Sequence, residues 1–485
     1  MAAEITRRNL SAGALLCNFI SHINHSEGSN FYSLYGLPPQ RLNALRQHRL
    51  GQFPEQQQTD LEWLQRIPKA ELHCHLGGIL TPREIIAVAE HSQTELADLC
   101  RQNPDLAAWQ EQIRASVSAR DTQSLRFWFK HKDELRRAVK DVPEPFCLIA
   151  FVLAFQKNPD LLERLIYHDY PDEVSFQGIG IENYERLGDL QGSGLLQNEN
   201  CLRAACQILI RYCLHENITY LELRCSPVNY TRGGLSGEKV TEILLQELQP
   251  CRSTHFSLLF IASRHGRMSD VYRQIELTAA MLDHPTLGED FRHRFVGFDL
   301  AGAEHSRSTR ELREAFSSLH KRCLNITIHA GETAPADSVW EAVYFLNADR
   351  IGHGLTLEDN PNLINLILNR RIAIEMCPSS NFQICSFWDA FITQSASNKT
   401  YPLQKYLQQG LRVSICTDNP GISSTTLSRE YLKAARLCPG GLSQWDTLRL
   451  CRNAFQASFA PFAIRREILR KAEKHISEIL EKNDY

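Results

Sequence analysis

The chain has 485 residues, with 53 basic and 56 acidic side chains and a formal net charge of -3. Hydrophobic residues make up 43% and charged residues 22%, as in ordinary globular proteins. The near-zero charge argues against a protein that binds nucleic acid by electrostatic attraction. No run of about 18 apolar residues is present, so we expect no membrane-spanning helix.

Residues 1–68 are predicted to form an N-terminal helical extension. Arg7 and Arg8 precede the apolar stretch 10–20, a pattern that resembles a twin-arginine export signal. Asn18 interrupts that stretch and no cleavage site follows, so we expect an amphipathic helix instead. The 15 cysteines contain no Cys-x-x-Cys pair, which favours reduced thiols and a cytoplasmic protein.

Residues 69–485 repeat one theme, an apolar run of strand length followed by helical periodicity. The eight runs are 70–76, 218–225, 256–264, 295–300, 326–330, 350–353, 372–377 and 411–417. Strands that alternate with helices and are buried on both faces form a parallel sheet, and eight of them predict a (β/α)8 TIM barrel in the α/β class. An open doubly wound sheet is the alternative, but no glycine-rich phosphate loop follows the first run.

A long insertion, residues 77–217, separates the first run from the second. The sequence Thr81-Pro82-Arg83-Glu84 is a typical helix start, and helical periodicity continues after it. Loops after barrel strands lie at the mouth of the barrel. We therefore expect the insertion to form a helical lid, and the insertion and the extension are candidate contacts in a homo-oligomer.

His73 and His75 are the first candidate functional residues in the chain. Residues i and i+2 of a strand point to the same face, so both imidazoles are expected to project into the barrel. Two histidines held side by side suit a divalent metal ion. A pair of structural histidines with ordinary hydrogen bonds is the alternative, since this pattern alone is weakly specific.

Further polar groups end other strand-length runs. His329 and Glu332 follow the fifth run, His353 ends the sixth, and Asp418 follows the eighth. The carboxyl ends of barrel strands form the catalytic face. Three imidazoles and one carboxylate suit zinc with a water molecule, whose pKa the metal lowers toward about 7. His353 can then serve as a base or an orienting group, and Glu332 can protonate a ring nitrogen or a leaving group.

These residues lie in blocks that resemble the adenosine deaminases of the amidohydrolase superfamily. The blocks appear in the order typical of that family and cover residues 69 to about 435. They are Glu71-Leu-His-Cys-His-Leu, Tyr220-Leu-Glu-Leu-Arg-Cys-Ser-Pro, Gly297-Phe-Asp-Leu-Ala-Gly, His329-Ala-Gly-Glu, Arg350-Ile-Gly-His-Gly, Glu375-Met-Cys-Pro-Ser-Ser-Asn and Thr417-Asp-Asn-Pro.

The resemblance implies zinc-dependent hydrolytic deamination at purine C6, which converts adenosine or deoxyadenosine to the inosine form and ammonia. It implies one Zn²⁺ per subunit, with ligands His73, His75, His329 and Asp418. By the same resemblance Glu332 protonates purine N1, His353 positions and deprotonates the attacking water, and the backbone of Gly302 contacts purine N3.

Two substrate-binding positions depart from the family pattern. Asn419 replaces an aspartate that faces purine N7, and an amide can donate to N7 directly. Gly77 replaces an aspartate that, beside His75, helps to hold the ribose 5′-hydroxyl. Because that carboxylate would repel a phosphate, its absence makes a 5′-phosphorylated substrate such as AMP or dAMP the alternative. A phosphate would need cations, for which Arg224, Arg264 and Lys130 are candidates.

Other functional classes have weaker support. A two-metal amidohydrolase would often have a lysine in the fourth run, and residues 295–300 contain none. Deaminases that act on nucleic acid need HxE and PCxxC motifs, which the chain lacks. A non-catalytic assembly protein would be expected to lose a ligand or Glu332. We therefore expect an enzyme whose partner is a small purine nucleoside or nucleotide.

Overall fold

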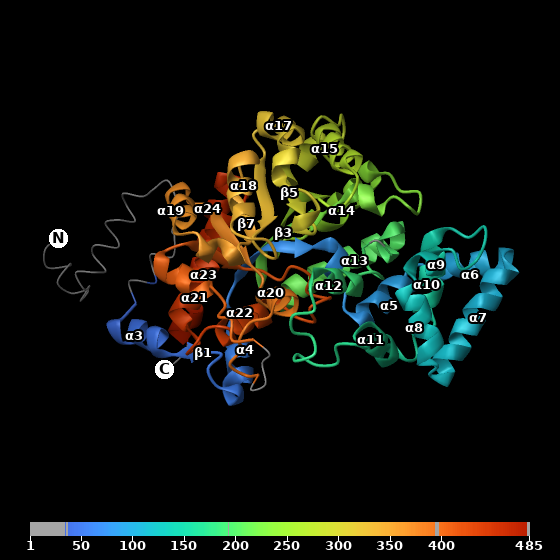
Figure 1. The fold of residues 1–485 in the computed structure, drawn as a ribbon, viewed down its shortest axis with the longest axis horizontal. Coiled ribbons are helices and arrows are strands. Elements are labelled where there is room, and N and C mark those ends of the chain that lie inside the picture. The colour runs from blue at the N-terminus through green and yellow to red at the C-terminus, as the bar shows by residue number, and fades with distance from the viewer. Residues whose placement is uncertain (1–33, 35–36, 193, 393–396, 483–485) are drawn as a thin grey trace, which may run out of the picture.

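The computed structural model describes residues 34, 37–192, 194–392 and 397–482. Its centre is an eight-stranded parallel sheet whose strands lie side by side in the order in which they occur in the chain (Figure 1). The strands are β2 (Lys69–His75), β3 (Ile218–Cys225), β4 (His255–Ser263), β5 (Phe295–Ala301), β6 (Asn325–Ala330), β7 (Arg350–His353), β8 (Ala373–Met376) and β9 (Arg412–Ile415). The eight predicted runs therefore correspond to the eight strands.

Backbone contacts between the first and last strands close the sheet. Cys74 and Asp418 form a parallel bridge just beyond the end of β9. The His75 N–H donates to the Asp418 carbonyl at 2.9 Å, and the Asp418 N–H donates to the His73 carbonyl at 2.8 Å. This topology confirms the predicted (β/α)8 barrel, and it brings the carboxyl ends of all eight strands to one rim.

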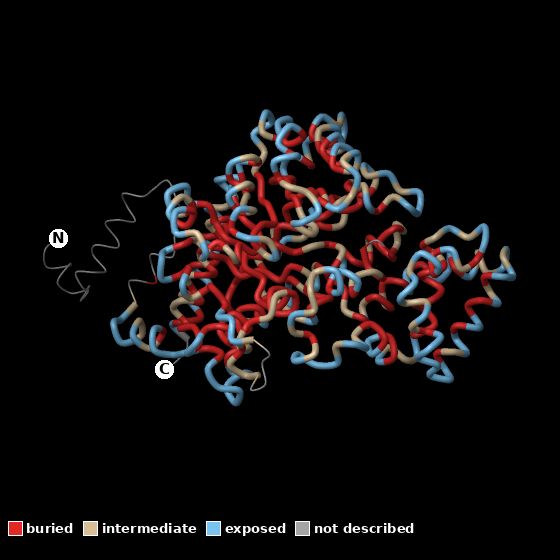
Figure 2. Tube along the Cα trace, viewed as in Figure 1, coloured by how far each residue is buried: buried red, intermediate tan, exposed pale blue. Residues whose placement is uncertain are grey.

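Helices surround the strands and bury their outward faces (Figure 2). The helices after β3 are α14 (Gly237–Leu248), α15 (Met268–Leu282), α16 (Gly288–Arg294), α17 (Arg313–Lys321), α18 (Asp337–Phe345), α19 (Pro361–Arg370), α20 (Pro378–Cys385), α21 (Leu403–Gln409), α22 (Leu427–Arg436), α23 (Gln444–Ala457) and α24 (Phe462–Lys482). For example, α15 packs on β4, and α23 packs on both β9 and β2. The buried apolar side chains of strands and helices form one continuous core.

The segment between β2 and β3 is helical. It contains α5 (Pro82–Glu90), α6 (Gln93–Gln102), α7 (Pro104–Ala119), α8 (Thr122–Lys130), α9 (Lys132–Arg136), α10 (Glu144–Leu153), α11 (Pro159–Ile166), α12 (Ile181–Leu187) and α13 (Glu199–His215). The start of α5 is a capping box between Thr81 and Glu84, with Pro82 in the first turn. Helices α6 to α10 form a lobe beside the barrel (Figure 1), in which Trp128 packs edge-on against Trp109.

The described part of the N-terminal segment packs on the C-terminal half of the barrel. It contains α3 (Pro39–Gln47), β1 (Arg49–Leu50) and α4 (Gln57–Arg66). Strand β1 pairs antiparallel with β10 (Leu442–Ser443), and α4 packs on α22. The predicted amphipathic helix near residues 10–20 lies outside the described residues. The boundary at residue 68 remains a prediction. Among the described helices, none is both long and apolar enough to span a membrane.

Candidate active site

A cavity of about 310 Å³ opens at the rim where the barrel strands end. Its walls include side chains from several strand ends, and α12 with the loop after it covers one side. The predicted site residues that line this cavity are His75, Gly77, Gly302, His329, Glu332, His353, Asp418 and Asn419. His73 is fully buried directly beside it. The structure therefore brings together the predicted metal-ligating, catalytic and purine-binding residues.

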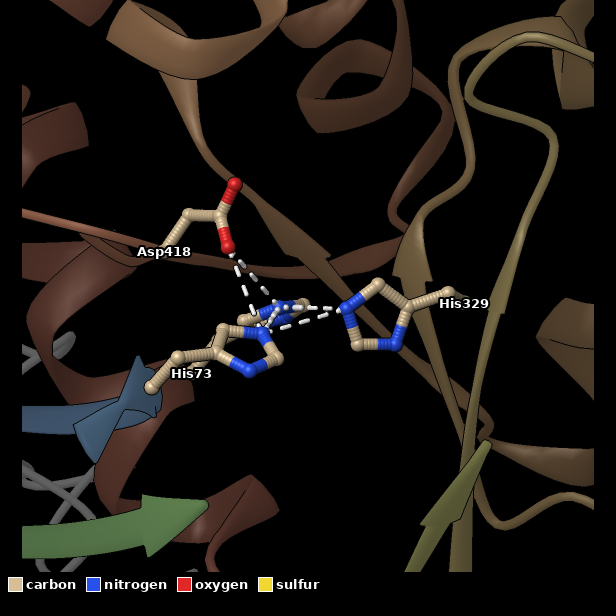
Figure 3. A group of neighbouring side chains, drawn as sticks. His73, His329 and Asp418 are labelled. Atoms are coloured by element: carbon tan, nitrogen blue, oxygen red, sulfur yellow. Dashed lines mark hydrogen bonds and ion pairs between the residues drawn. The ribbon is translucent and has the colours of Figure 1, made fainter. Parts of the chain in front are cut away.

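Four of these residues form a compact cluster. The Nε2 atom of His73 lies 3.1 Å from Nε2 of His75 and 3.0 Å from Nε2 of His329. Asp418 Oδ1 lies 3.3 Å from Nε2 of His75. Figure 3 shows His73, His329 and Asp418 pointing toward one common space. One ligand atom from each of the four residues lies within 4.8 Å of the others.

Carboxylates behind the cluster fix which ring nitrogens face inward. His73 Nδ1 contacts Glu375 Oε2 at 3.0 Å, and His329 Nδ1 contacts Asp299 Oδ1 at 3.2 Å. Because carboxylates accept hydrogen bonds, the ring hydrogens lie on Nδ1 and the Nε2 lone pairs converge. The Nε2 atoms of His73 and His329 lie 3.0 Å apart. Their lone pairs repel one another unless both nitrogens bind the same cation. The donor set therefore fits a divalent metal ion.

Burial also favours the ligand form of the histidines. Desolvation lowers the pKa of His73 and His75 well below the usual value, so both rings are neutral at pH 7. Burial alone would raise the pKa of Asp299, but Arg224 and the neighbouring His329 and His75 together outweigh burial and hold that pKa well below its usual range. Asp299 therefore remains an acceptor for His329.

A buried ionic network supports these carboxylates from within the barrel. Arg224 pairs with Asp299 at 2.6 Å and also with Glu375. Arg350 pairs with Glu375 at 2.6 Å and also with Glu222. All five side chains are at most 1% exposed. The positive charge of each arginine thus balances the charge of carboxylates that water cannot reach.

Replacing Arg224 with methionine is expected to lower the free energy of unfolding by about 3–5 kcal/mol, because Asp299 and Glu375 would lose a buried partner. Urea denaturation at 25 °C would measure this loss. The matched control is Arg322→Met, whose partner Asp283 is 64% exposed, and it should leave the urea midpoint unchanged. Equal midpoints for the two variants would show that the buried network does not stabilise the fold.

Glu332 lies beside the cluster, and its side chain is 9% exposed. Desolvation, with the nearby charges of Asp418 and Glu304, raises the pKa of Glu332 well above its usual value. The shift favours the protonated form of the carboxyl, which is the form that can act as an acid. Its loop is held by the Glu304 carboxylate, which accepts backbone N–H groups from Gly331, Glu332 and Thr333 at 2.7–2.9 Å.

His353 is the last residue of β7 and has a positive φ of 66°. Its side chain is 1% exposed. Asp418 also has a positive φ, 59°, although neither residue is glycine. Such conformations are uncommon for residues with side chains and occur often at functional sites. The unusual backbone at two strand ends aims both side chains at the cavity that they line.

Gly302 has a φ of 89°, and a Cβ atom there would lie 2.6 Å from Nδ1 of His265. A side chain at this position would therefore collide with the cavity wall, and the backbone of Gly302 stays accessible to a ligand. Asn419 donates from Nδ2 to Asp418 Oδ1 at 2.8 Å. The same nitrogen carries a second N–H, and the Asn419 side chain also forms a hydrogen bond with Tyr184.

The loop after α12 approaches Gly77 closely. The Gly192 N–H lies 3.4 Å from the Gly77 carbonyl, and a Cβ atom on Gly77 would lie 3.4 Å from Cα of Gly192. Thus a second glycine, in the loop after α12, packs directly on the first. That 3.4 Å distance is an ordinary van der Waals contact, whereas a Cβ atom on Gly192 would lie 2.8 Å from Cα of Gly77. The close approach therefore requires glycine at position 192, and the packing leaves room for a Cβ atom at position 77.

The three cations suggested for a phosphate do not meet at the cavity. Arg224 is buried in its ion pairs with Asp299 and Glu375. Arg264 is 2% exposed and donates to the His329 carbonyl at 2.5 Å. Lys130 is exposed on α8 and does not line the cavity. Arg224 and Arg264 thus make their contacts inside the barrel, and Lys130 lies on α8 outside the cavity lining.

A comparison with protein-family models matches residues 177–475 to the family described as adenosine deaminase. This match covers more than half of the chain. The chain belongs to the adenosine deaminase family. Its members are hydrolases that remove an amino group by cleaving a C–N bond, and the amidohydrolase resemblance seen in the sequence is thereby confirmed.

Individual relatives agree with the adenosine deaminase family assignment. A probable adenosine deaminase from Dictyostelium discoideum is 28% identical over 88% of this chain, although the match covers only 45% of that protein. An adenosine deaminase from Clostridium acetobutylicum is 25% identical over 85% of this chain and 99% of its own length. An amidohydrolase from Burkholderia ambifaria, solved with bound zinc, has a TM-score of 0.60 and 17% identity, covering 87% of this chain and 95% of that one.

Sequence reasoning identified the adenosine deaminase blocks but gave no role to several residues within them. Asp299 and Glu375 orient the two buried histidines, and Asn381 contacts both Glu332 and His353. All three lie in blocks quoted for the family resemblance, and that position was the available signal. Glu185 and Glu304, which line the cavity, carried no signal of this kind.

Proposed function

We propose that this member of the adenosine deaminase family is a zinc-dependent hydrolytic deaminase of adenine nucleosides. The products are the corresponding inosine nucleoside and ammonia. The observation that carries the proposal is the position of the Glu332 carboxyl, whose pKa is raised, beside a four-ligand cluster in one cavity. A buried acid next to a site for an attacking water is what addition to an aromatic C–N bond requires.

His73, His75, His329 and Asp418 would hold the zinc ion. When bound, zinc lowers the pKa of a water molecule to about 7 and so supplies a nucleophile at neutral pH. The chain holds the ligands ready through Glu375 and Asp299, which fix the ring orientations of His73 and His329. Such hydrogen bonds behind a metal site reduce the rearrangement that binding would otherwise need.

Glu332 would donate its proton to purine N1 as water attacks C6. Protonation at N1 withdraws electron density from C6, and the raised pKa of Glu332 favours the protonated form that supplies this proton. Asn381 donates to Glu332 Oε1 at 3.1 Å and thereby orients the carboxyl. His353 lines the same cavity and would orient the attacking water.

Two further groups would position the purine. One N–H of the Asn419 amide donates to Asp418, so the other can donate to purine N7, which only accepts hydrogen bonds. The backbone of Gly302 would contact purine N3, and its glycine conformation keeps a side chain out of that space. Together with Glu332 they would contact three ring nitrogens, which fixes the orientation of C6.

The charges of the cavity support a nucleoside over a 5′-phosphorylated nucleotide. Among the described lining residues Arg224 is the single arginine or lysine, and it is paired with Asp299 and Glu375. Helix α12 and the loop after it contribute two carboxylates to the cavity lining, Glu185 and Asp189. Lys132 pairs with Asp189, whereas no described residue forms an ion pair with Glu185. Desolvation raises the pKa of Glu185 and so favours its neutral form. A phosphate would therefore find no unpaired arginine or lysine among the described lining residues.

Deamination of adenosine, deoxyadenosine, AMP and dAMP, followed by ultraviolet absorbance, tests the substrate. We expect turnover of the two nucleosides, with kcat/KM for AMP at least about 100-fold lower because desolvating a phosphate without a cation to pair with it costs several kcal/mol. AMP turnover equal to or above that of adenosine would contradict the nucleoside proposal and favour the nucleotide alternative. No turnover of any member of the panel would contradict both.

A further inference from the structure

Asn381 connects the two candidate catalytic side chains. It lies on α20, is fully buried, and its Nδ2 atom is 2.9 Å from His353 Nδ1 and 3.1 Å from Glu332 Oε1. One amide nitrogen has two hydrogens, so it can donate to both atoms at once. Whether Asn381 donates to these two atoms therefore depends on which amide atom is the nitrogen and which is the oxygen.

The surroundings of Asn381 fix that orientation. Its Oδ1 atom lies 3.2 Å from the backbone nitrogen of Cys377 and 2.9 Å from the hydroxyl of Tyr401. A backbone N–H can only donate, so the atom that faces Cys377 must be the amide oxygen. Reversing the amide would place two donors against each other in a buried site, at a cost of about 1–3 kcal/mol for the unsatisfied group.

The tautomer of His353 follows from this orientation. Nδ1 faces an amide hydrogen and must therefore accept, so it carries no hydrogen of its own. Its other near neighbour, Glu332 Oε1 at 3.3 Å, accepts from the same amide. We propose that Asn381 is a positioning residue that holds neutral His353 in the tautomer with its hydrogen on Nε2.

The consequence for the reaction rests on the proposed function. Nε2 is on the ring edge away from Asn381, and the ring lies 5.1 Å from His73 and 5.2 Å from His329, centre to centre. An N–H there donates to the oxygen of the attacking water. In this tautomer the ring has no lone pair at Nε2, so it orients the water and does not remove its proton. That proton would pass to solvent, since a bound zinc ion would lower the pKa of the water to about 7. This differs from the base role that the family resemblance implies.

Nitrogen-15 NMR of the zinc-loaded protein, labelled at histidine, tests the tautomer directly. Long-range nitrogen–proton correlations distinguish a protonated ring nitrogen from an unprotonated one in each histidine. The chain has 18 histidines, so the His353 signals are assigned by their loss in His353→Gln. We expect an unprotonated Nδ1 and a protonated Nε2 for His353 in the wild-type protein.

Asn381→Asp is the informative variant because it keeps the shape and replaces the donor by a second acceptor. The ring hydrogen of His353 should move to Nδ1. The spectrum should then show a protonated Nδ1 and an unprotonated Nε2. We also expect kcat to fall by at least about 10²-fold, with a smaller change in KM. Tyr401→Phe is the matched control: Cys377 still fixes the amide, so the wild-type tautomer should remain.

Two results would overturn the proposal: a wild-type His353 with hydrogen on Nδ1, or an Asn381→Asp protein that is folded and keeps the wild-type tautomer. If the variant fails to fold, the wild-type spectrum alone decides. The proposed function can fail separately, since a protein with the expected tautomer but without deaminase activity would contradict that function and leave the role of Asn381 intact.

Discussion

Replacing His329 with alanine is expected to reduce kcat/KM by at least about 10³-fold, since it removes one of four proposed zinc ligands and a metal ion contributes several kcal/mol to such a reaction. The zinc content per chain, measured by mass spectrometry, should fall together with the activity. A chelator should inactivate the wild-type protein, and added zinc should restore it.

The matched control for this prediction is His475→Ala, an exposed histidine on α24 far along the chain from the candidate site. It should keep full zinc content and full turnover. A His329→Ala protein with one zinc per chain and wild-type turnover would contradict the ligand assignment. Loss of zinc without loss of turnover would show that the reaction does not need the ion, and would contradict the zinc-dependent mechanism.

Replacing Glu332 with glutamine is expected to lower kcat by about 10²–10⁴-fold, the range for loss of a positioned general acid. Glutamine keeps the size and can still accept from Asn381, but it has no acidic proton for N1. The zinc content should equal that of the wild type. Glu358→Gln, which changes an acid paired with Lys405 on the surface, is the matched control and should keep full activity.

The pH dependence provides a second measure of the Glu332 role. Burial raises the pKa of Glu332, so its proton is present below that raised value and is lost as the pH rises through it. In the wild type, kcat/KM should therefore decline on the alkaline side. The residual activity of Glu332→Gln should lack this decline. A wild-type rate in the glutamine variant, at any pH, would contradict the acid role.

The barrel could be predicted from the sequence because its strands are short apolar runs in regular alternation with helices. Each of the eight runs corresponds to a strand, and boundaries shift by only a few residues, as where the run 411–417 becomes Arg412–Ile415. Polar residues at the ends of such runs necessarily share one rim in a closed parallel barrel. The clustering of His73, His329, His353 and Asp418 followed from that rule.

Features that depend on contacts between distant segments could not be predicted in this way. Strand β1 has two residues, too few for a periodic pattern, and forms only by pairing with Leu442 and Ser443. Gly77 gave no sign that Gly192 packs on it, because loop positions follow from tertiary packing. The role of Asn381 likewise depends on donors at Cys377 and Tyr401 that surround it only in the folded protein.

The bridge between Cys74 and Asp418 has a consequence for the synthesis of the protein. Two of the four clustered residues lie on the first barrel strand, and the carboxylate follows the last one. A growing chain therefore contains no complete site until nearly the whole barrel has left the ribosome. An ion that needs all four groups would bind the closed form preferentially and stabilise it through mass action. The supply of that ion during biosynthesis would thus influence how much of the newly made protein reaches the closed barrel.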